Sequence, residues 1–338
     1  MDSLGLTRLP GPALADFPPF LVRAPWWGGD LQTLRNYLVR WGMPLPSAER
    51  IYLPMRDGSG DRLVGSLHRP PPASGPAPAR PLVVLIHGLS GCEQSHYMVK
   101  TAAHLLALGF TVLRLNLRGA GASRPHCRFQ YYAGRSGDFA DVLAALPFEL
   151  IKGGIVAIGY SLGANMLLKY LGEWGSDAPL KGAIAVSAPL DLAGTARRMM
   201  WRRNSLYQRY LLRHMRAESL GPGAEVTAAE RAAIIGARSI WEFDHRFSAP
   251  RNGFAGAEDY YERNAASHFL DGIAVPTLVI HALDDPWIPP EPYLGYAWRR
   301  NPSLIPLLPP RGGHVGFQGR DRRIPWHDLC ATRFLAAL

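Results

Sequence analysis

Six short apolar runs recur along the chain after residue 80, and segments with helical periodicity separate them. The runs are aliphatic on both faces, which is typical of strands buried inside a parallel sheet. The runs cover residues 82–86, 110–117, 155–158, 183–186, 277–280 and 303–308, and the helical segments include 96–108, 138–150 and 162–173. This alternation predicts an α/β fold, in which a mostly parallel sheet is covered by helices on both sides. We therefore expect the chemistry at the carboxyl ends of the strands.

The alternation stops between Leu192 and Ala274, where helical segments and a long aromatic stretch replace it before the strand pattern resumes. A chain of 338 residues could hold two small domains, but this pattern favours one domain that carries an insertion. We expect residues 51–192 and 275–338 to form the α/β core, residues 193–274 a helical cap, and residues 1–50 an N-terminal extension packed on the core.

Two further local patterns lie before the alternating region. Residues 1–50 are rich in Pro and Trp and include a short helical candidate at 31–39, while residues 62–68 alternate like a strand. The tryptophans are expected to pack against the core rather than to form a ligand platform. The proline-rich stretch 70–78 cannot supply the donors of a sheet and is expected to form a surface loop.

The bulk composition is that of a soluble protein. Hydrophobic residues make up 47% of the chain and charged residues 19%, and no apolar run approaches the roughly 18 residues that a membrane-spanning helix needs. The N-terminal segment lacks a basic region followed by an apolar block, so no secretory signal is recognised and a cytoplasmic location is expected.

Neither a disulfide framework nor a metal site is expected. Cys92, Cys127 and Cys330 are an odd number without close pairing. His96 and His327 lie near two of these cysteines in the sequence, but neither arrangement repeats as a paired zinc motif. We therefore predict that the protein binds no metal.

A glycine-rich turn at residues 118–124 follows the run 110–117. A dinucleotide-binding fingerprint would need a third glycine at position 124, where the chain has Arg124. No cofactor is therefore predicted, and the turn is expected to shape the rim of the pocket.

The formal net charge of +10 raises the question of an anionic partner. No basic and aromatic nucleic-acid module is recognisable, so we do not expect nucleic-acid binding. Residues 197–216 combine seven arginines with apolar side chains, a pattern that suits either a helix roofing the active site or a helix lying on a membrane. Burial over the site is favoured, and weak peripheral contact with anionic membranes stays open. The sequence leaves the oligomeric state undetermined.

The apolar run at 155–158 ends in Gly159-Tyr160-Ser161-Leu162-Gly163, after which a helical segment begins. Flanking glycines allow a strand to turn sharply into a helix, so that the serine sits strained and exposed above the sheet. The free N–H groups at the start of the following helix point toward the same place. This Gly-x-Ser-x-Gly turn predicts that Ser161 is a nucleophile.

A serine hydroxyl needs a base, and the base needs an orienting acid. Asp284 and Asp285 follow the run ending at residue 280, and His314 lies in a glycine-rich loop after the run ending at residue 308. We predict a triad of Ser161, Asp285 and His314. These residues follow one another in the order Ser, Asp, His along the chain, each just after a predicted strand. Asp285 is preferred because its spacing to Ala282 and Pro289 fits the usual Gly-x-x-Asp-x-x-x-Pro pattern, and Asp284 is the alternative.

In this arrangement His314 accepts the Ser161 proton and later returns a proton to the leaving alcohol, while the carboxylate fixes the imidazole tautomer. The backbone N–H groups of Leu162 and Leu89 are the predicted oxyanion hole, Leu89 belonging to the His-Gly turn at 87–91. His87 itself is expected to stabilise that turn rather than to act as the base. A non-catalytic relative that keeps the fold for binding remains the alternative.

With these motifs, the chain resembles the YheT-like branch of the α/β-hydrolase superfamily, a group of predicted esterases and lipid-acting hydrolases. The resemblance implies an α/β-hydrolase fold with a cap and carries over Ser161, Asp285 and His314 as the triad. The chain departs from the group where residues 26–30 replace the usual Asn-Pro-His lead into Leu-Gln-Thr. Beyond the serine turn, the shared segments are Asp30-Leu31-Gln32-Thr33, Asn116-Leu117-Arg118-Gly119, residues 132–138, Glu242-Phe243-Asp244, Gly253-Phe254, residues 258–261, Asp284-Asp285-Pro286 and residues 313–317.

Members of this branch look like carboxylesterases, monoacylglycerol lipases, phospholipases or acyltransferases. The resemblance and the apolar cap favour a serine hydrolase that cleaves carboxylic esters of short to medium acyl chains, with acylglycerols among the candidates, through an acyl-Ser161 intermediate. An acyltransferase that passes the acyl group to an alcohol with the same triad is the second hypothesis. Small ester or lipid substrates are thus the expected partners.

Overall fold

A computed structural model describes residues 17–39, 45–71, 80–320 and 323–338. Trp41 and most of the proline-rich stretch 70–78 lie outside the described residues. An eight-stranded sheet forms the centre, in the order β1-β2-β4-β3-β5-β6-β7-β8. The strands are β1 (Glu49–Pro54), β2 (Arg62–His68), β3 (Leu82–Ile86), β4 (Val112–Leu115), β5 (Ile155–Tyr160), β6 (Gly182–Val186), β7 (Thr277–Ile280) and β8 (Leu304–Leu307).

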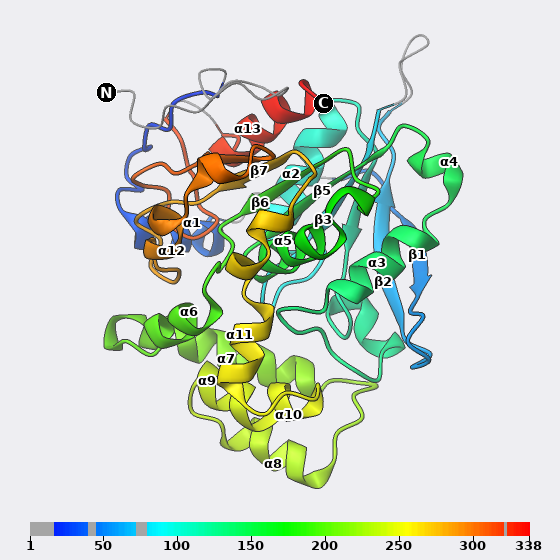
Figure 1. The fold of residues 1–338 in the computed structure, drawn as a ribbon, viewed down its shortest axis with the longest axis vertical. Coiled ribbons are helices and arrows are strands. Elements are labelled where there is room, and N and C mark those ends of the chain that lie inside the picture. Colours follow the sequence, from blue (N-terminus) through cyan, green and yellow to red (C-terminus); the bar gives the residue numbers. More distant parts are fainter. Residues whose placement is uncertain (1–16, 40–44, 72–79, 321–322) are drawn as a thin grey trace.

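The sheet is mostly parallel. The strands from β4 to β8 along the sheet pair in parallel, whereas β2 pairs antiparallel with both β1 and β4. Parallel strands must be joined by crossovers, which here are helices that cover both faces. The predicted α/β fold class is confirmed, and Figure 1 shows the helices on either side of the sheet.

Alternate residues of the central strands pack into two different hydrophobic cores, one on each face of the sheet. In β3, Val84 packs in the core shared with α3 (Ser136–Ala145) and α5 (Leu162–Trp174). Its neighbour Leu85 packs in the opposite core, which α2 (His96–Ala107) and α13 (Trp326–Leu335) cover. Because successive side chains of a strand point to opposite faces, a strand covered on both sides has to be apolar throughout. This explains why the runs in the sequence show no alternation.

The structure corrects two of the predicted elements and adds a strand. The helix expected over 138–150 is two helices, α3 and α4 (Phe148–Ile151), because Pro147 has no N–H and holds the preceding Leu146 in an extended conformation. The strand expected over 110–117 is shortened to β4. The added strand is β1, which begins at Glu49 at one edge of the sheet and which the sequence pattern did not reveal.

The segment between β6 and β7 forms a helical layer that lies at one end of the sheet, at the bottom of Figure 1. Its single expected amphipathic helix is broken near Trp201 into two helices. The helices of this layer are α6 (Leu192–Met199), α7 (Ser205–Ser219), α8 (Ala228–Gly236), α9 (Ile240–Phe243), α10 (Ala249–Arg251) and α11 (Ala257–Asn264).

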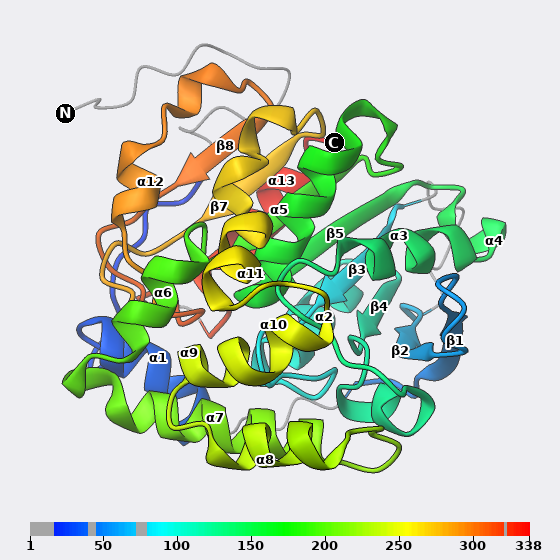
Figure 2. The same cartoon turned by 60° about the horizontal axis from the view of Figure 1, so that its bottom comes forward.

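Figure 2 shows α1 (Gly29–Leu38) beside α7. The short helix α12 (Glu291–Gly295) lies between β7 and β8.

The last part of the expected cap belongs with the core. The 3₁₀ turns at Ala266–His268 and Leu270–Gly272 pack on α5, where Phe269 lies so close that a side chain at Gly172 would collide with it. Within the described ranges, no helix combines the length and the apolarity that crossing a membrane requires.

Candidate active site

The turn from β5 into α5 holds Ser161 in a strained conformation. Its φ of 51° and ψ of −121° lie outside the regions that a side-chain-bearing residue usually adopts. The two flanking glycines are required by space, since a Cβ on Gly159 would lie 2.6 Å from the carbonyl oxygen of Gly163, and a Cβ on Gly163 would lie 2.4 Å from that of His87. This close packing places the serine hydroxyl at the carboxyl edge of the sheet.

Three side chains from distant parts of the sequence meet at this edge. The Ser161 Oγ lies 3.0 Å from Nε2 of His314, and Nδ1 of His314 lies 2.8 Å from Oδ2 of Asp285. Asp285 follows β7 and His314 follows β8. Because these two strands are parallel, both loops begin at the carboxyl end of the sheet. The structure therefore brings together the three residues that the sequence predicted for the triad.

Asp285 is completely buried and is prepared to be ionised. Burial alone would raise the pKa of its carboxyl, but the neighbouring His314 and a backbone N–H hold that pKa below its usual value. Its Oδ1 accepts hydrogen bonds from the N–H groups of Trp287 and Ile288, at 2.8 and 3.0 Å. An ionised carboxylate only accepts hydrogen bonds, so Nδ1 of His314 carries the proton and Nε2 offers its lone pair to the serine.

The neighbouring carboxyl of Asp284 has a different partner. Its Oδ1 accepts the backbone N–H of Gly313 at 2.9 Å, and its Oδ2 is buried without a hydrogen-bond partner in the described part of the chain. Burial raises the pKa of Asp284. Asp284 thus contacts the backbone of the loop that carries His314. Of the two carboxyls, only that of Asp285 contacts the imidazole.

The imidazole of His314 is also held by an aromatic ring that was not among the predicted site residues. Trp287 stacks on it with 4.3 Å between ring centroids and 29° between planes. Trp287 directly follows the Asp-Asp-Pro segment, and this position is the only sequence signal that could have indicated its role.

The predicted oxyanion donors both face the same cavity as Ser161. Leu89 and Leu162 line this cavity, and neither backbone N–H donates to another group in the described ranges. An unpartnered N–H beside a nucleophile is free to donate to a substrate oxygen. His87 uses both ring nitrogens for the turn, with Nδ1 2.8 Å from the Gly88 oxygen and Nε2 accepting the N–H of Leu117. Burial lowers the pKa of His87 to about 4, which keeps it neutral.

A chain of hydrogen bonds ties the turn at 88–91 to the cap. The N–H of Ser90 donates to the hydroxyl of Tyr131 at 2.8 Å, and that hydroxyl donates to Oε2 of Glu218 on α7 at 3.1 Å. Burial raises the pKa of Glu218 to about 8, although Tyr131 and the nearby Arg124 act in the opposite direction. Two hydrogen bonds therefore link the carboxyl of Glu218 in the cap to the backbone of Ser90, the residue that follows Leu89.

The N-terminal helix α1 contacts the loop that carries His314 through a polar face. Thr33 Oγ1 accepts the backbone N–H of His314 at 2.8 Å, and the Asn36 side-chain amide donates to the Val315 oxygen at 2.9 Å. The Gln32 side chain accepts the N–H of Gln318 at 2.7 Å. None of these three residues was among the predicted site residues. The sequence signal available was that the polar residues Gln32, Thr33 and Asn36 recur at helical spacing in a short helix.

The cavity above Ser161 has a volume of about 550 Å³ and extends under the cap. Seven apolar side chains of α6, α7 and α9 line it from the cap, namely Leu192, Ala196, Met199, Leu211, Met215, Ile240 and Phe243. The apolar face of the arginine-rich segment thus covers the cavity, as the sequence pattern favoured.

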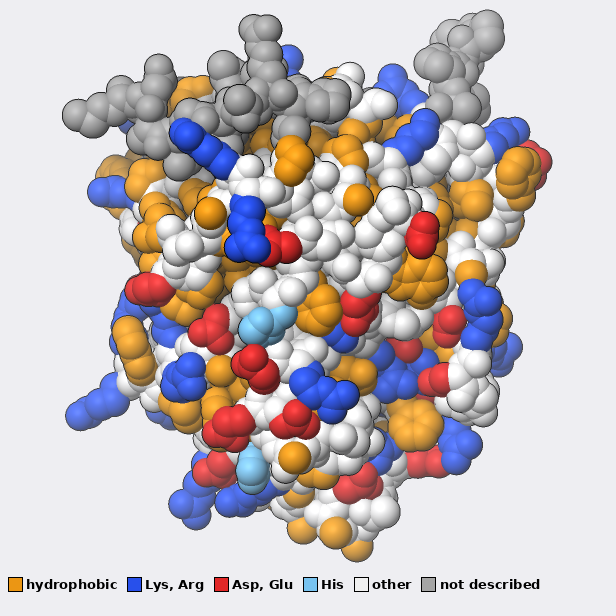
Figure 3. Space-filling view, viewed as in Figure 1, with side chains coloured by type: hydrophobic (Ala, Val, Ile, Leu, Met, Phe, Trp, Pro, Cys, Tyr) orange, Lys and Arg blue, Asp and Glu red, His pale blue; other side chains and the backbone are white. Residues whose placement is uncertain are grey.

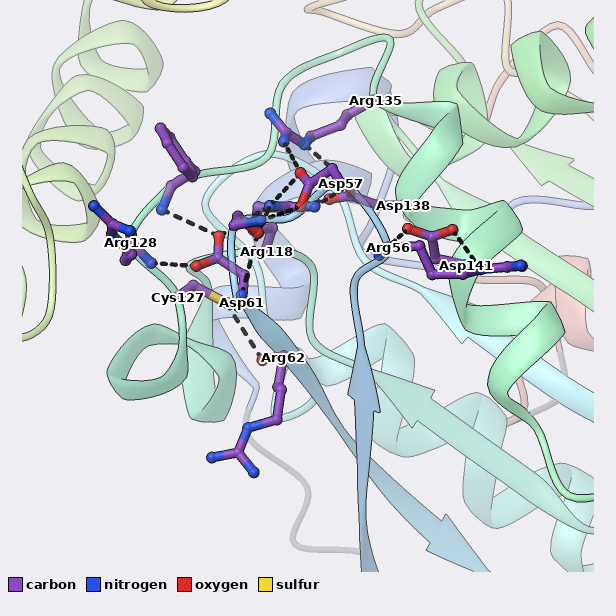
Figure 4. Close-up of polar contacts among 12 residues, drawn as sticks. Arg56, Asp57, Asp61, Arg62, Arg118, Cys127, Arg128, Arg135, Asp138 and Asp141 are labelled. Carbon is purple, nitrogen blue, oxygen red and sulfur yellow. Dashed lines mark hydrogen bonds and ion pairs between the residues drawn. The ribbon is translucent and has the colours of Figure 1, made fainter.

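The glycine-rich turn at 118–124 does not line this cavity, contrary to expectation. Its Arg118 is fully buried and forms ion pairs with Asp57 at 2.9 Å, Asp61 at 2.9 Å and Asp138 at 2.7 Å (Figure 4). Three carboxylates around one guanidinium hold its pKa above the usual value despite burial. This network joins the β1–β2 hairpin to the start of α3, and residues 130–133 line the cavity instead.

The three cysteines are free, and among the described residues no cluster of three or more His, Cys, Asp or Glu is arranged to hold a metal ion.

Comparison with known proteins agrees with the observed fold. A family model for the alpha/beta hydrolase fold matches residues 81–229. The putative esterase YheT of Escherichia coli (strain K12) is 33% identical over 248 residues, which are 71% of this chain and 71% of the E. coli protein. The chain belongs to the YheT-like branch of the α/β-hydrolase superfamily.

Other members of this superfamily carry more specific names. The medium-chain fatty acid ethyl ester synthase/esterase 2 of Saccharomyces cerevisiae is 30% identical, over 75% of this chain and 61% of the yeast protein. The human phospholipase ABHD3 is 26% identical, over 71% of this chain and 59% of the human protein. These relatives place the YheT-like chain in a family of esterases and other hydrolases.

A solved esterase structure shows the same fold. The Pyrococcus furiosus esterase Pf2001 superposes with a TM-score of 0.59 and 15% identity, over 95% of this YheT-like chain and 97% of the esterase. At this identity the likeness concerns the fold alone.

Proposed function

We propose that this protein is a cofactor-independent serine hydrolase that cleaves carboxylic esters of short to medium acyl chains, acylglycerols being candidates. One observation supports this most: the Ser161 hydroxyl lies 3.0 Å from His314 Nε2, at the base of a cavity with an apolar cap lining. A base within hydrogen-bonding distance can remove the serine proton as the oxygen attacks. The names of the yeast and human relatives, an ester synthase/esterase and a phospholipase, agree with an acyl substrate.

The proposed reaction proceeds in two halves. Ser161 Oγ attacks the ester carbonyl while His314 takes its proton, and the resulting oxyanion accepts hydrogen bonds from the N–H groups of Leu89 and Leu162. The C–O bond then breaks, the imidazolium returns the proton to the leaving alcohol, and an acyl-Ser161 ester remains. Water activated by His314 attacks this ester and releases the acid. Asp285 keeps the imidazole in the required tautomer throughout.

The same acyl-enzyme could pass its acyl group to an alcohol instead of water. The yeast relative, named a synthase/esterase, favours testing this second function. Added ethanol that diverts the acyl group into ethyl ester would support transfer, whereas free acid as the sole product would support hydrolysis.

Labelling with a fluorophosphonate probe tests the serine mechanism directly. Stoichiometric labelling that is lost in Ser161→Ala supports it, and absence of labelling in the folded protein would favour a binding role for the fold. A series of p-nitrophenyl esters of increasing chain length then measures how long an acyl chain the cavity accepts. A peak of kcat/KM at short to medium chains is expected, and a monotonic rise toward long chains would contradict the proposed substrate range.

A further inference from the structure

The surface where α1 meets α6 and α7 exposes large apolar side chains. We call this surface the mouth face and define it by Trp27, Leu31, Leu38, Met200, Trp201 and Leu206. Trp27 was expected to pack against the core, but it is 59% exposed. Leu206 is 73% exposed and Leu38 is 67% exposed, which are high fractions for leucine. Single exposed apolar residues are common on soluble proteins, but a group of six from adjacent elements indicates a contact surface.

Contacts between α1 and α7 make the mouth face continuous. Asp30 on α1 accepts hydrogen bonds from Arg203 at 2.7 Å and from Tyr207 at 3.1 Å. The rings of Tyr37 and Tyr210 pack edge to face across the same junction, with 5.5 Å between centroids. The elements that carry the exposed apolar side chains are therefore in direct contact.

The mouth face adjoins the cavity above Ser161 at Tyr37 and Tyr210. Among the described residues that line this cavity, three are exposed to solvent: Tyr37, Gln94 and Tyr210. Two of the three belong to the ring pair that joins α1 to α7. An acyl chain entering the cavity would thus pass directly from this surface.

The charge of the mouth face is strongly positive. Four exposed arginines of α6, α7 and their connection make no ion pair within the described residues, and Asp30 is already paired with Arg203. On α7, Leu206, Arg209, Tyr210 and Arg213 repeat at intervals of three and four residues, so apolar and basic groups alternate on one outward stripe. At the left edge of Figure 3, where Figure 1 shows α6, basic and hydrophobic side chains reach the surface together. The four unpaired arginines are Arg197, Arg202, Arg209 and Arg213.

We propose that the mouth face docks on the surface of anionic lipid, so that ester substrates enter the cavity from the lipid phase. Exposed Trp and Leu side chains insert at the boundary between headgroups and acyl chains, and arginines pair with anionic headgroups. The exposed leucines favour lipid over nucleic acid, whose outer surface is the charged sugar-phosphate backbone. This docking adds a partner to the proposed esterase site, and its explanation of substrate entry rests on that proposed function.

Vesicle binding tests the docking without catalysis. The Ser161→Ala protein is mixed with vesicles of phosphatidylcholine alone or of phosphatidylcholine with phosphatidylglycerol, and the bound fraction is measured by co-sedimentation. Binding is expected to the anionic vesicles and to weaken strongly at 1 M salt, where the screening length falls to about 3 Å. Because turnover plays no part, failure to bind would overturn the docking and leave the esterase proposal standing.

Matched substitutions locate the surface. Leu206→Glu and the pair Arg209→Glu with Arg213→Glu are expected to lower the vesicle partition coefficient at least about tenfold, since each contributes inserted or attracting groups. Phe148→Glu is the control, because Phe148 is equally exposed at 73% but lies on α4 near the opposite edge of the sheet (Figure 1). These side chains do not line the cavity, so hydrolysis of a water-soluble p-nitrophenyl ester should stay within about twofold of wild type.

Three outcomes would overturn the docking. They are equal binding to neutral and anionic vesicles, equal loss of binding in Phe148→Glu and Leu206→Glu, and self-association in sedimentation that Leu206→Glu abolishes while vesicles bind no protein. The last result would make the mouth face an interface between two copies of this chain.

Discussion

His314 contacts Asp285 through its side chain and Asp284 only through the backbone of its loop. The imidazole Nδ1 lies 2.8 Å from Oδ2 of Asp285, while Asp284 accepts the N–H of the preceding Gly313 at 2.9 Å. Two adjacent carboxylates thus stabilise one loop in different ways, and their substitution should separate orientation of the imidazole from stability of the loop.

Asp285→Asn is expected to lower kcat about 10⁴-fold with little change in KM, because an amide donating to Nδ1 would select the wrong imidazole tautomer. Asp284→Asn keeps an oxygen for the Gly313 N–H and should lower kcat less than about tenfold. Steady-state kinetics with p-nitrophenyl butyrate would compare the two variants. A larger loss in Asp284→Asn would reassign the acid of the triad.

Tyr131→Phe should lower kcat about tenfold, since the Ser90 N–H would lose its acceptor and the neighbouring Leu89 N–H would be held less firmly. Tyr132→Phe is the matched control, because Tyr132 also lines the cavity but its hydroxyl makes no hydrogen bond within the described residues. The kcat for a short p-nitrophenyl ester is the measurement. Equal effects of the two substitutions would show that the Tyr131 hydroxyl does not act through the turn.

Glu218 should make stability depend on pH. Its pKa is raised from 4.5 to about 8, so between these values the folded protein keeps a proton that the unfolded chain releases. Stability from this group is therefore fully present below about pH 4.5 and is lost as pH rises toward 8. Relative to Glu218→Gln, the wild type should lose roughly 2 to 4 kcal/mol between pH 5 and 8.

Urea unfolding of both proteins at several pH values would measure this difference. Asp244 and Asp328 also have raised pKa values, of about 6 and about 7, but they are present in both proteins and cancel in the comparison. Parallel stability profiles for the two proteins would show that Glu218 titrates normally in the folded state.

Features that depend on neighbours in the sequence were predictable. Gly159, Ser161 and Gly163 specify a strand-to-helix turn because the steric requirement is local, and the Asp285 spacing follows from the geometry of a single loop. The break of the expected helix at Pro147 was also readable from the sequence, because the residue before a proline avoids helical conformation.

Features that depend on packing between distant segments were not predictable from one sequence. The contact between Thr33 and the N–H of His314 joins residues 281 positions apart, and no local pattern records it. The stacking of Trp287 on His314 and the approach of Glu218 to Tyr131 arise in the same way, from where the fold brings a loop and the cap together. Arg118, by contrast, was recognised within a motif but serves a buried ion-pair network outside the cavity.

The N-terminal helix should therefore matter for catalysis although it supplies no reacting group. Thr33→Val keeps the side-chain shape but removes the acceptor of the His314 N–H, so kcat should fall about tenfold and stability by about 1 to 3 kcal/mol. Thr33→Ser retains the hydroxyl and should recover most of the kcat, which a loss of methyl packing alone would not allow. Kinetics of both variants with one p-nitrophenyl ester, alongside urea unfolding, would decide the matter. If Thr33→Val kept full kcat while losing stability, α1 would support the fold without positioning His314.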